Sequence, residues 1–550
     1  MHRIAALPAL LIAAAISWFL WSYLGRPIDI VDVPRGHLQC LSYSPASEEH
    51  SPLNAKDGLF HVPDGMVERD LKILSNYTDC IRTYSMLGDQ GKAMKAAHEA
   101  GIKVMVGIWI GADDARNEAE ISEALRLANM YPENVRSIVV GNEVMLRREM
   151  TPERLAGIIR SVKARTTFPV TYADIYEFWR RNPILADAVD LVTVHVLPYW
   201  DDPHPVSIDQ VQAHSRRIIE DTQKLFPGKT IQIGEIGWPS AGRTRSGGAP
   251  SLVNEARFVR EFAAQAEAIG VPYNLIEAID QPWKRMPEGT VGGYWGILDK
   301  DRELKFPLTG PVSEWPQWRL AAAFTAIVTL IAFAWALLWD KPITPVRWFG
   351  LGIAAPAVGA TCWALGDQLL AIVLNNWWGW AWISLLMLIA VIGGGLLIYA
   401  VAGGRNVPKP AGFDGVLEAI RTRRFSGSQI IGAYHWAVML PAAVLAVSMA
   451  IDGRHRDFLQ LAFWLPAAAF LLLYIQPSTR ERTDKAQPEE AWIALLILIA
   501  GPFAIDQFIN LEACVWAATC VVLAAPWLEF VLREGARVRD AFRRPLSGGT

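Results

Sequence analysis

Two glutamates close apolar runs at widely separated points of the chain. Glu143 stands in RSIVVGNEVMLRR (136–148), and Glu235 stands in TIQIGEIGWPSAG (230–242). Cleavage of a glycosidic bond requires two carboxyls that flank one cleft, one protonated and the other ionised. Repulsion between two acids in a partly dry site raises one pKa and so separates the two roles. The pair therefore predicts acid-assisted cleavage of an acetal, provided that the fold brings the two residues together.

The elements that must position these acids are short apolar runs, each followed by a helix-like stretch. Their starts lie roughly 20 to 43 residues apart, which is typical of the strand–loop–helix–loop units of a (β/α)8 barrel. The stretch 151–164 opens with a Thr cap and a proline, and 254–270 closes on a glycine. The eight expected strands are 38–44, 80–85, 103–110, 137–143, 169–174, 191–200, 230–238 and 273–283.

Functional side chains of such a barrel project from the C-terminal ends of its strands. Glu143 would then end the fourth strand and Glu235 the seventh, so that both face one mouth. Aromatic rings at the same ends suit the apolar C–H faces of sugar rings. The residues predicted to bind substrate beside the two acids are Tyr43, Arg82, Tyr84, Asn142, Tyr172, His195, Tyr199, Trp238, Asp280 and Trp283.

Each of these residues also has a purely structural explanation when it is taken alone. Glu143 could pair with Arg147, and His195 could be a hydrogen-bonded core residue. Arg82 needs an acid partner, which either glutamate could supply, and the aromatic rings could be packing. The recurrence of acids, a histidine and aromatics at one end of the repeat favours a site.

The motifs around these residues resemble glycoside hydrolase family 17, the β-1,3-glucanase family. GNEV (141–144) is similar to its acid/base motif, GEIGWPS (234–240) to its nucleophile motif, IRTYS (81–85) to its second strand and EAIDQPWK (277–284) to its eighth strand in bacterial members. The resemblance covers roughly residues 35–300. It implies that Glu143 is the proton donor and Glu235 the nucleophile of a retaining enzyme, with Asn142 at the sugar 2-hydroxyl.

Long apolar segments flank this region. Residues 5–24 could cross a bilayer as a helix, and interfacial aromatics at its far end favour an uncleaved anchor over a signal peptide. We expect about seven further spans, and we divide the chain into an N-terminal transmembrane anchor (1–24), a barrel (25–317), a transmembrane domain (318–532) and a basic cytoplasmic tail (533–550). The expected later spans are 318–339, 349–373, 378–402, 431–450, 457–475, 491–508 and 511–531.

Loop charge predicts the orientation of these spans. If the N-terminus is cytoplasmic, the inner loops and tail hold 15 Lys and Arg residues, and the outer loops between the later spans hold only Arg454 and Arg456. The whole chain also resembles bacterial membrane-bound members associated with β-(1,3)/β-(1,6)-glucan synthesis. We therefore expect a multi-pass protein of the bacterial cytoplasmic (inner) membrane with a periplasmic catalytic domain.

Composition excludes several other classes of protein. The net charge is −3 and no basic stripe is present, so a nucleic-acid partner is not expected. None of the five cysteines forms a C-x-x-C pair, and neither a metal nor an organic cofactor is implied. Cys40 and Cys80 fall in expected strands and are interpreted as buried thiols in preference to a bridge.

The sequence leaves three functions open. The first is transglycosylation or branching of β-1,3-glucan through a glycosyl-enzyme, the reaction we expect from the membrane context. The second is hydrolysis by a membrane-anchored endo-β-1,3-glucanase, which would use the same residues. The third is a glucan-binding or export component, in which the trailing spans would be the working part instead of an anchor. The expected partners are a β-glucan oligo- or polysaccharide and the lipid bilayer. A separate glucan synthase could be a protein partner.

Overall fold

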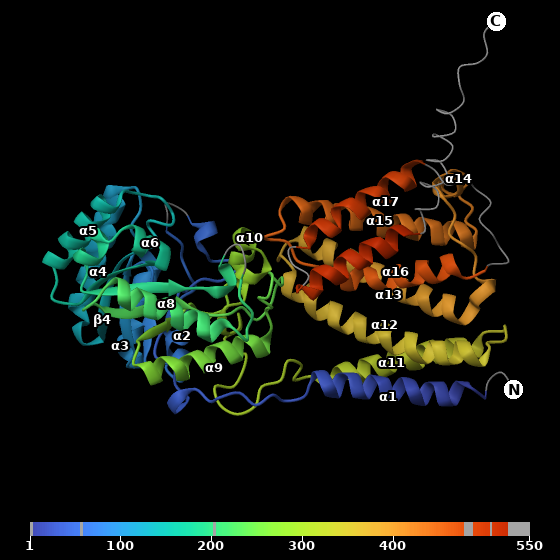
Figure 1. Ribbon diagram of the computed structural model, residues 1–550, viewed down its shortest axis with the longest axis horizontal. Helices are drawn as coiled ribbons and strands as arrows, with labels where there is room; N and C mark the ends of the chain where they lie inside the picture. The colour runs from blue at the N-terminus through green and yellow to red at the C-terminus, as the bar shows by residue number, and fades with distance from the viewer. Residues whose placement is uncertain (1–3, 56–58, 202–204, 478–487, 506–508, 526–550) are drawn as a thin grey trace, which may run out of the picture. The chain divides into compact units, whose positions relative to one another are not determined.

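The computed structural model describes residues 4–55, 59–201, 205–477, 488–505 and 509–525. The chain forms two compact units, one made of Pro27–Glu314 and the other of Met1–Arg26 with Trp315–Thr550. We refer to the first as the barrel unit and to the second as the helical unit (Figure 1).

The barrel unit is a closed barrel of eight parallel strands in sequence order, in which the first strand pairs with both the second and the eighth. The apolar runs form strands because their side chains are buried on both faces, in the barrel interior and under the surrounding helices. The fold class expected from the sequence is confirmed. The strands are β1 (Leu41–Ser42), β2 (Cys80–Arg82), β3 (Lys103–Ile108), β4 (Val135–Asn142), β5 (Val170–Ile175), β6 (Leu191–Val196), β7 (Thr230–Ile236) and β8 (Tyr273–Leu275).

Helices pack around these strands (Figure 1). Two of them have the ends that the sequence indicates. Helix α5 begins at Pro152 under the Thr151 side chain, which accepts a hydrogen bond from the Arg154 N–H, and α9 ends at a left-handed Gly270. The main helices are α2 (Met66–Leu74), α3 (Lys92–Ala100), α4 (Asp114–Met130), α5 (Pro152–Ala164), α6 (Tyr176–Arg181), α7 (Ile184–Ala188), α8 (Val211–Leu225) and α9 (Leu252–Ile269).

The eighth apolar run, expected as one strand over 273–283, is divided in the structure. Only β8 belongs to the barrel, and β9 (Glu277–Ile279) leaves it to pair with β10 (Gly296–Leu298) in a separate two-stranded sheet. The N–H of Ile276, between the two pieces, still donates to the carbonyl oxygen of Ile236. Asp280 is consequently carried beside β10 and away from the barrel strands.

The expectation that Cys40 and Cys80 are free thiols is wrong, because the structure joins them in a disulfide. The parallel pairing of Leu41 with Ile81 places the two cysteines side by side, with their Cα atoms 4.3 Å apart. Both are buried in a small apolar cluster with residues of β3, β4 and β5. Strand register decides this contact, and register is not visible in the composition of either segment.

In the helical unit, five of the described helices are long and apolar enough to cross a membrane. They are α1 (Ala6–Leu24), α11 (Trp318–Leu338), α12 (Pro345–Ile372), α13 (Trp377–Gly403) and α15 (Gly427–Ile451). Helix α16 (Gln460–Ile475) and the helix Leu511–Ala525 are apolar but shorter. The described part of the chain therefore has fewer full-length spans than the eight expected.

The expected span 491–508 is interrupted. Helix α17 (Pro488–Ala500) ends before Gly501, and a 3-10 turn follows at Pro502–Ala504. The proline lacks the N–H that would continue the α-helical hydrogen bonds. The end of the last expected span and the basic tail 533–550 lie outside the described residues.

Helix α1 packs against α11 and α12 as an integral member of the helical unit. The indole N–H of Trp21 donates to the hydroxyl of Thr325 at 2.9 Å. Gly352 lies so close to α1 that a Cβ there would approach the carbonyl oxygen of Ala9 to 2.7 Å. A short helix that the sequence did not predict, α14 (Phe413–Thr422), connects α13 with α15.

Candidate active site

The end of β4 bends sharply to present Glu143. Gly141 has φ 87°, and a Cβ at this position would lie 2.8 Å from a methyl group of Val144, so only glycine fits. Glu143 itself has φ 52°, a left-handed conformation that is uncommon for a residue with a side chain. Its N–H still donates to the carbonyl oxygen of Ala173 on β5, which ties the bend to the barrel.

The end of β7 presents Glu235 beside His195 of β6. Gly234 precedes it, and a Cβ there would lie 2.5 Å from Thr193 and 2.9 Å from the His195 ring. Arg82 donates through Nη1 to Glu235 Oε1 and to the Gly234 carbonyl oxygen, each at 2.9 Å. This fixed cation holds one oxygen of the Glu235 carboxylate.

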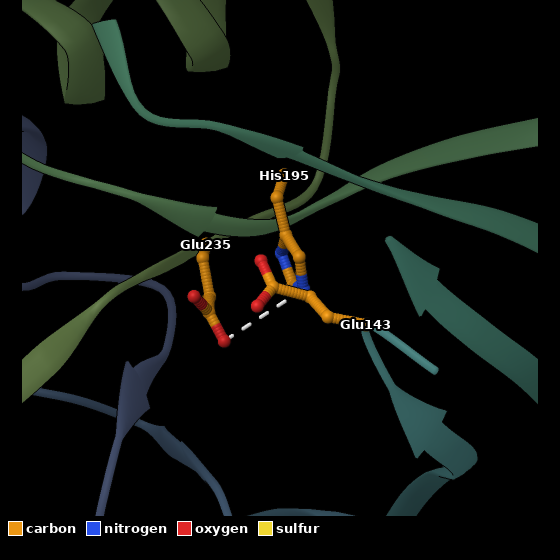
Figure 2. Close-up of side chains that lie close together, drawn as sticks. All are labelled: Glu143, His195 and Glu235. Atoms are coloured by element: carbon orange, nitrogen blue, oxygen red, sulfur yellow. Dashed lines mark ion pairs between the residues drawn. The ribbon is translucent and has the colours of Figure 1, made fainter. Parts of the chain in front are cut away.

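The two glutamates converge on one point, as Figure 2 shows. One oxygen of Glu143, one oxygen of Glu235 and one ring nitrogen of His195 lie within 4.8 Å of one another. Retaining glycosidases hold their two carboxyl groups about 5–5.5 Å apart, and inverting enzymes hold them about 6.5–9.5 Å apart. The spacing in this barrel lies on the short side, where one carboxylate can reach an anomeric carbon directly.

The environment of Glu143 favours its protonated form. Burial, the charge of Glu235 and the charge of Asp174 together raise the pKa of Glu143 to about 8, against smaller opposing effects of Arg82 and Arg147. Near pH 7 this carboxyl therefore keeps its proton and can donate it.

The environment of Glu235 favours its charged form. Burial opposes ionisation, but His195, Arg82, Lys284 and a hydrogen bond from the Tyr84 hydroxyl outweigh it, so the pKa of Glu235 lies below its usual value. Burial also lowers the pKa of His195 to about 4, so this ring is neutral near pH 7. The permanent positive charges that keep Glu235 ionised are therefore those of Arg82 and Lys284.

Four of the predicted substrate-binding residues surround this pair. Besides Arg82, the hydroxyl of Tyr84 donates to Glu235 Oε1 at 3.0 Å. The side-chain oxygen of Asn142 accepts from Arg82 Nη2 at 2.5 Å and lies 3.1 Å from His195 Nε2. Because these bonds occupy the oxygen of Asn142, its amide nitrogen is the part available to donate to a ligand.

The hydroxyls of Tyr43 and Tyr172 have hydrogen-bond partners other than Glu143 and Glu235. Both are buried, with relative exposures of 1% and 0%. The Tyr43 hydroxyl donates to Asp70 of α2 at 3.1 Å. The Tyr172 hydroxyl donates to Asp174, beneath the bend that follows β4. Their polar ends are thus engaged within the protein.

Tyr199 and Trp238 are also buried in the unit, and their polar groups bond to backbone oxygens of one loop. The Tyr199 hydroxyl donates to the carbonyl oxygen of Arg243 at 2.6 Å, and the Trp238 indole N–H donates to that of Ala249 at 3.1 Å. The two rings meet edge to face, with centroids 6.2 Å apart. This arrangement anchors the 240–250 loop.

Asp280 lies in a second buried cluster, where Lys305 Nζ is 2.9 Å from Asp280 and 3.0 Å from Glu255. Its partners therefore differ from those of the catalytic pair. Trp283 is half-buried, and its indole N–H donates to Gln281 at 2.8 Å.

Sequence reasoning missed the partly buried ion pair of Lys284 and Glu277 beside the site. Lys284 helps to lower the pKa of Glu235 and also acts on Tyr84. The only signal in the sequence was a lysine at the end of EAIDQPWK, in a run expected to be a strand. Its role depends on the turn that follows β9, which the pattern did not reveal.

Glu143, His195 and Glu235 have the ligand types and spacing that could also hold a metal ion. Arg82 opposes this use, because its guanidinium lies 2.9 Å from Glu235 Oε1 and would repel a cation at that oxygen. These three side chains are better suited to an organic substrate that becomes positively charged only in the transition state.

A parallel barrel with two facing carboxyls of opposite pKa shift at its C-terminal end is an arrangement of glycoside hydrolases. Residues 40–296 match the family described as the BtgE/BtgC glycoside hydrolase domain. The glucan 1,3-beta-glucosidase of Candida albicans is 27% identical over 268 residues, covering 44% of this chain and 85% of that protein. The Saccharomyces cerevisiae protein of the same name is 26% identical over 270 residues, covering 44% of this chain and 84% of that protein.

Among solved structures, the glycoside hydrolase family 17 β-1,3-glucanosyltransferase from Rhizomucor miehei matches 49% of this chain and 96% of its own, with 23% identity and a TM-score of 0.43. The family match and the named relatives agree with the two glutamate motifs. Residues 40–296 of the barrel unit therefore resemble a glycoside hydrolase domain of the family 17 type, and the protein is a glycosidase.

Proposed function

We propose that this protein is a retaining enzyme that acts on β-1,3-linked glucan through a covalent glycosyl-enzyme. The observation that carries the proposal is the close approach of Glu143 and Glu235, within 4.8 Å, with their pKa values displaced in opposite directions. The names of the fungal relatives, glucan 1,3-beta-glucosidases, support β-1,3-glucan as the substrate class.

In the first step, a carboxylate oxygen of Glu235 attacks the anomeric carbon while Glu143 gives its proton to the departing glycosidic oxygen. The bond from the anomeric carbon to that oxygen breaks, and an ester bond to Glu235 forms. In the second step, Glu143, now ionised, takes a proton from the acceptor hydroxyl. The acceptor oxygen then bonds to the anomeric carbon and releases Glu235.

The acceptor decides the product. We propose that a glucan hydroxyl is the usual acceptor, so that the enzyme transfers and branches chains, forming β-1,6 as well as β-1,3 linkages. Hydrolysis is the alternative and uses the same residues with water. The full-length protein in detergent should convert laminari-oligosaccharides into longer as well as shorter products. Exclusively shorter products at every substrate concentration would contradict transfer, and linkage analysis identifies the bond that is made.

We also propose that the helical unit spans the bacterial inner membrane, with the barrel unit on the extracytoplasmic side. Support comes from the five long apolar helices, the excess of basic residues in alternate loops and the Cys40–Cys80 disulfide. Disulfides persist in oxidising compartments such as the periplasm and are rare in the cytoplasm. Protease added to spheroplasts should remove the barrel unit, and protection of that unit in sealed spheroplasts would contradict the orientation.

A further inference from the structure

Tyr172 and Asp174, two residues of β5, form a buried hydrogen-bonded pair beneath the bend that follows β4. The Tyr172 hydroxyl donates to Asp174 Oδ2 and accepts from the backbone N–H of Met145 at 3.1 Å. Asp174 Oδ1 accepts from the N–H of Ile175 at 2.8 Å. Both side chains have a relative exposure of 0%, so their polar groups face protein only.

The segment above the pair is a bend without a regular helix, and it carries Glu143. Glu143 and Arg148 both have left-handed backbone angles, with φ 52° and φ 58°. The N–H of Arg147 donates to the Glu143 carbonyl oxygen at 2.8 Å, which closes one turn. Strained backbone of this kind persists only where the surrounding structure holds it.

We propose that Tyr172 and Asp174 are positioning residues for Glu143, which hold the 143–148 bend so that its carboxyl stays within reach of Glu235. The inference rests on the proposed function, in which Glu143 is the proton donor. It gives Tyr172 a different role from the substrate contact expected from the sequence.

The contacts of the pair account for this role. Tyr172 bridges β5 and the bend, because one oxygen both donates to Asp174 and accepts from Met145. The ring of Tyr172 also lies 3.4 Å from where a Cβ of Gly141 would stand, so it supports the entry to the bend as well. The pair thus contacts the chain on both sides of Glu143.

The charge of Asp174 adds an electrostatic contribution. It is one of the effects that raise the pKa of Glu143, after burial and Glu235. The charged and titratable groups that face Glu143 from the packed elements are Glu235 from β7, His195 from β6, Asp174 and Tyr172 from β5, Arg82 from β2 and Arg147 from the bend.

The test compares Tyr172→Phe and Asp174→Asn with a matched control, Tyr273→Phe, in the full-length protein. Tyr273 is also a buried strand tyrosine whose hydroxyl accepts from a backbone N–H, that of Gln39 at 3.3 Å. General acid–base catalysis contributes about 100- to 10,000-fold, so partial misplacement should lower kcat on laminari-oligosaccharides roughly 10- to 100-fold with KM little changed. The control should keep wild-type kcat.

A second substrate separates positioning from general damage to the fold. An aryl β-glucoside with a good leaving group needs no proton donor, and azide as acceptor needs no general base. With this substrate and azide, Tyr172→Phe and Asp174→Asn should keep activity within about threefold of wild type, and azide should restore activity to Glu143→Ala. An equal loss on both substrates would overturn the inference. If azide fails to restore the activity of Glu143→Ala, the assignment of Glu143 as proton donor in the proposed function is wrong, and the positioning inference is not the cause.

The pH profile provides a further readout. Asp174→Asn removes a negative charge near Glu143, so the alkaline limb of kcat on laminari-oligosaccharides should move to lower pH. An unchanged limb would show that Asp174 exerts no such influence. If Asp174→Asn does not fold, Tyr172→Phe, which removes one oxygen atom, decides the positioning role by its azide result.

Discussion

The carboxyls of Glu143 and Glu235 lie close together, yet their surroundings give them opposite charge states. Burial and the two neighbouring acids raise the pKa of Glu143 to about 8. At Glu235, the combined effects of His195, Arg82, Lys284 and the Tyr84 hydroxyl outweigh burial and lower the pKa. One mouth therefore holds a protonated and an ionised carboxyl at the same pH, which is the condition for the first step of the proposed retaining mechanism.

The first prediction at this scale is a bell-shaped pH profile. Activity should rise as Glu235 ionises below its ordinary pKa of 4.5 and should fall as Glu143 loses its proton near pH 8. The measurement is kcat/KM on laminari-oligosaccharides from pH 3 to 10. An alkaline limb that persists in Glu143→Gln on an activated aryl glucoside would show that another group causes it.

The second prediction concerns Arg82, whose side chain is 1% exposed and pairs with Glu235. Arg82→Gln should raise the pKa of Glu235 and so move the acidic limb to higher pH. Because the loss of one partner of a buried pair typically costs about 3–5 kcal/mol, the Tm should also fall. Arg126→Gln, which breaks an exposed pair with Glu123, is the matched control and should change neither quantity. Unchanged pH dependence in Arg82→Gln would refute the electrostatic account of Glu235.

At the scale of elements, the site depends on how two strands end. Strand β4 ends in a bend that requires Gly141, and β7 places Gly234 against His195. The sequence predicted the barrel because eight apolar runs of suitable spacing are a strong periodic signal. It predicted Glu143 and Glu235 because both close such runs.

Other features of these elements could not be predicted from pattern alone. The division of the 273–283 run at Ile276 depends on which neighbour each half pairs with, and the Cys40–Cys80 bridge depends on register between β1 and β2. Tyr43 directly follows β1 as expected, whereas Tyr172 lies within β5, and side-chain packing decides where both hydroxyls point. Long-range packing of this kind is not encoded in the spacing of residue types.

The third prediction tests the bend at Gly141. Gly141→Ala must place a Cβ 2.8 Å from Val144 at φ 87°, whereas Gly228→Ala has a similar φ of 84° with no neighbour within 4 Å. The left-handed conformation costs both variants roughly 1–2 kcal/mol, so the comparison isolates the contact with Val144. Gly141→Ala should lose at least tenfold in kcat, while Gly228→Ala should keep wild-type kcat. Equal activities would mean that the bend adapts without displacing Glu143.

At the scale of the whole molecule, a catalytic barrel is combined with a helical unit of five long apolar helices among the described residues. Within the helical unit, α1 is packed through Trp21, Thr325, Ala9 and Gly352. A segment with such contacts is expected to remain attached in the mature protein. N-terminal sequencing of the protein purified from membranes should therefore find α1 present, and a start near residue 25 would contradict this.

A further prediction at this scale concerns the disulfide of the barrel unit. Under denaturing, non-reducing conditions a thiol reagent should label three of the five cysteines, Cys362, Cys514 and Cys520. Loss of a native disulfide typically costs about 2–4 kcal/mol, so Cys40→Ala should lower the Tm of the barrel unit. Cys514→Ala, in the helical unit, is the control. Labelling of all five cysteines would refute the bridge.

The most direct test of the catalytic account is to locate the covalent intermediate. A 2-deoxy-2-fluoro glucosyl fluoride extended by β-1,3-linked glucose should trap the full-length protein, because the fluorine slows turnover of the glycosyl-enzyme. Mass spectrometry of the digested protein should then find the sugar on the peptide that contains Glu235, with one adduct per chain. An adduct on Glu143 or another residue, or complete turnover without any adduct, would contradict Glu235 as the nucleophile.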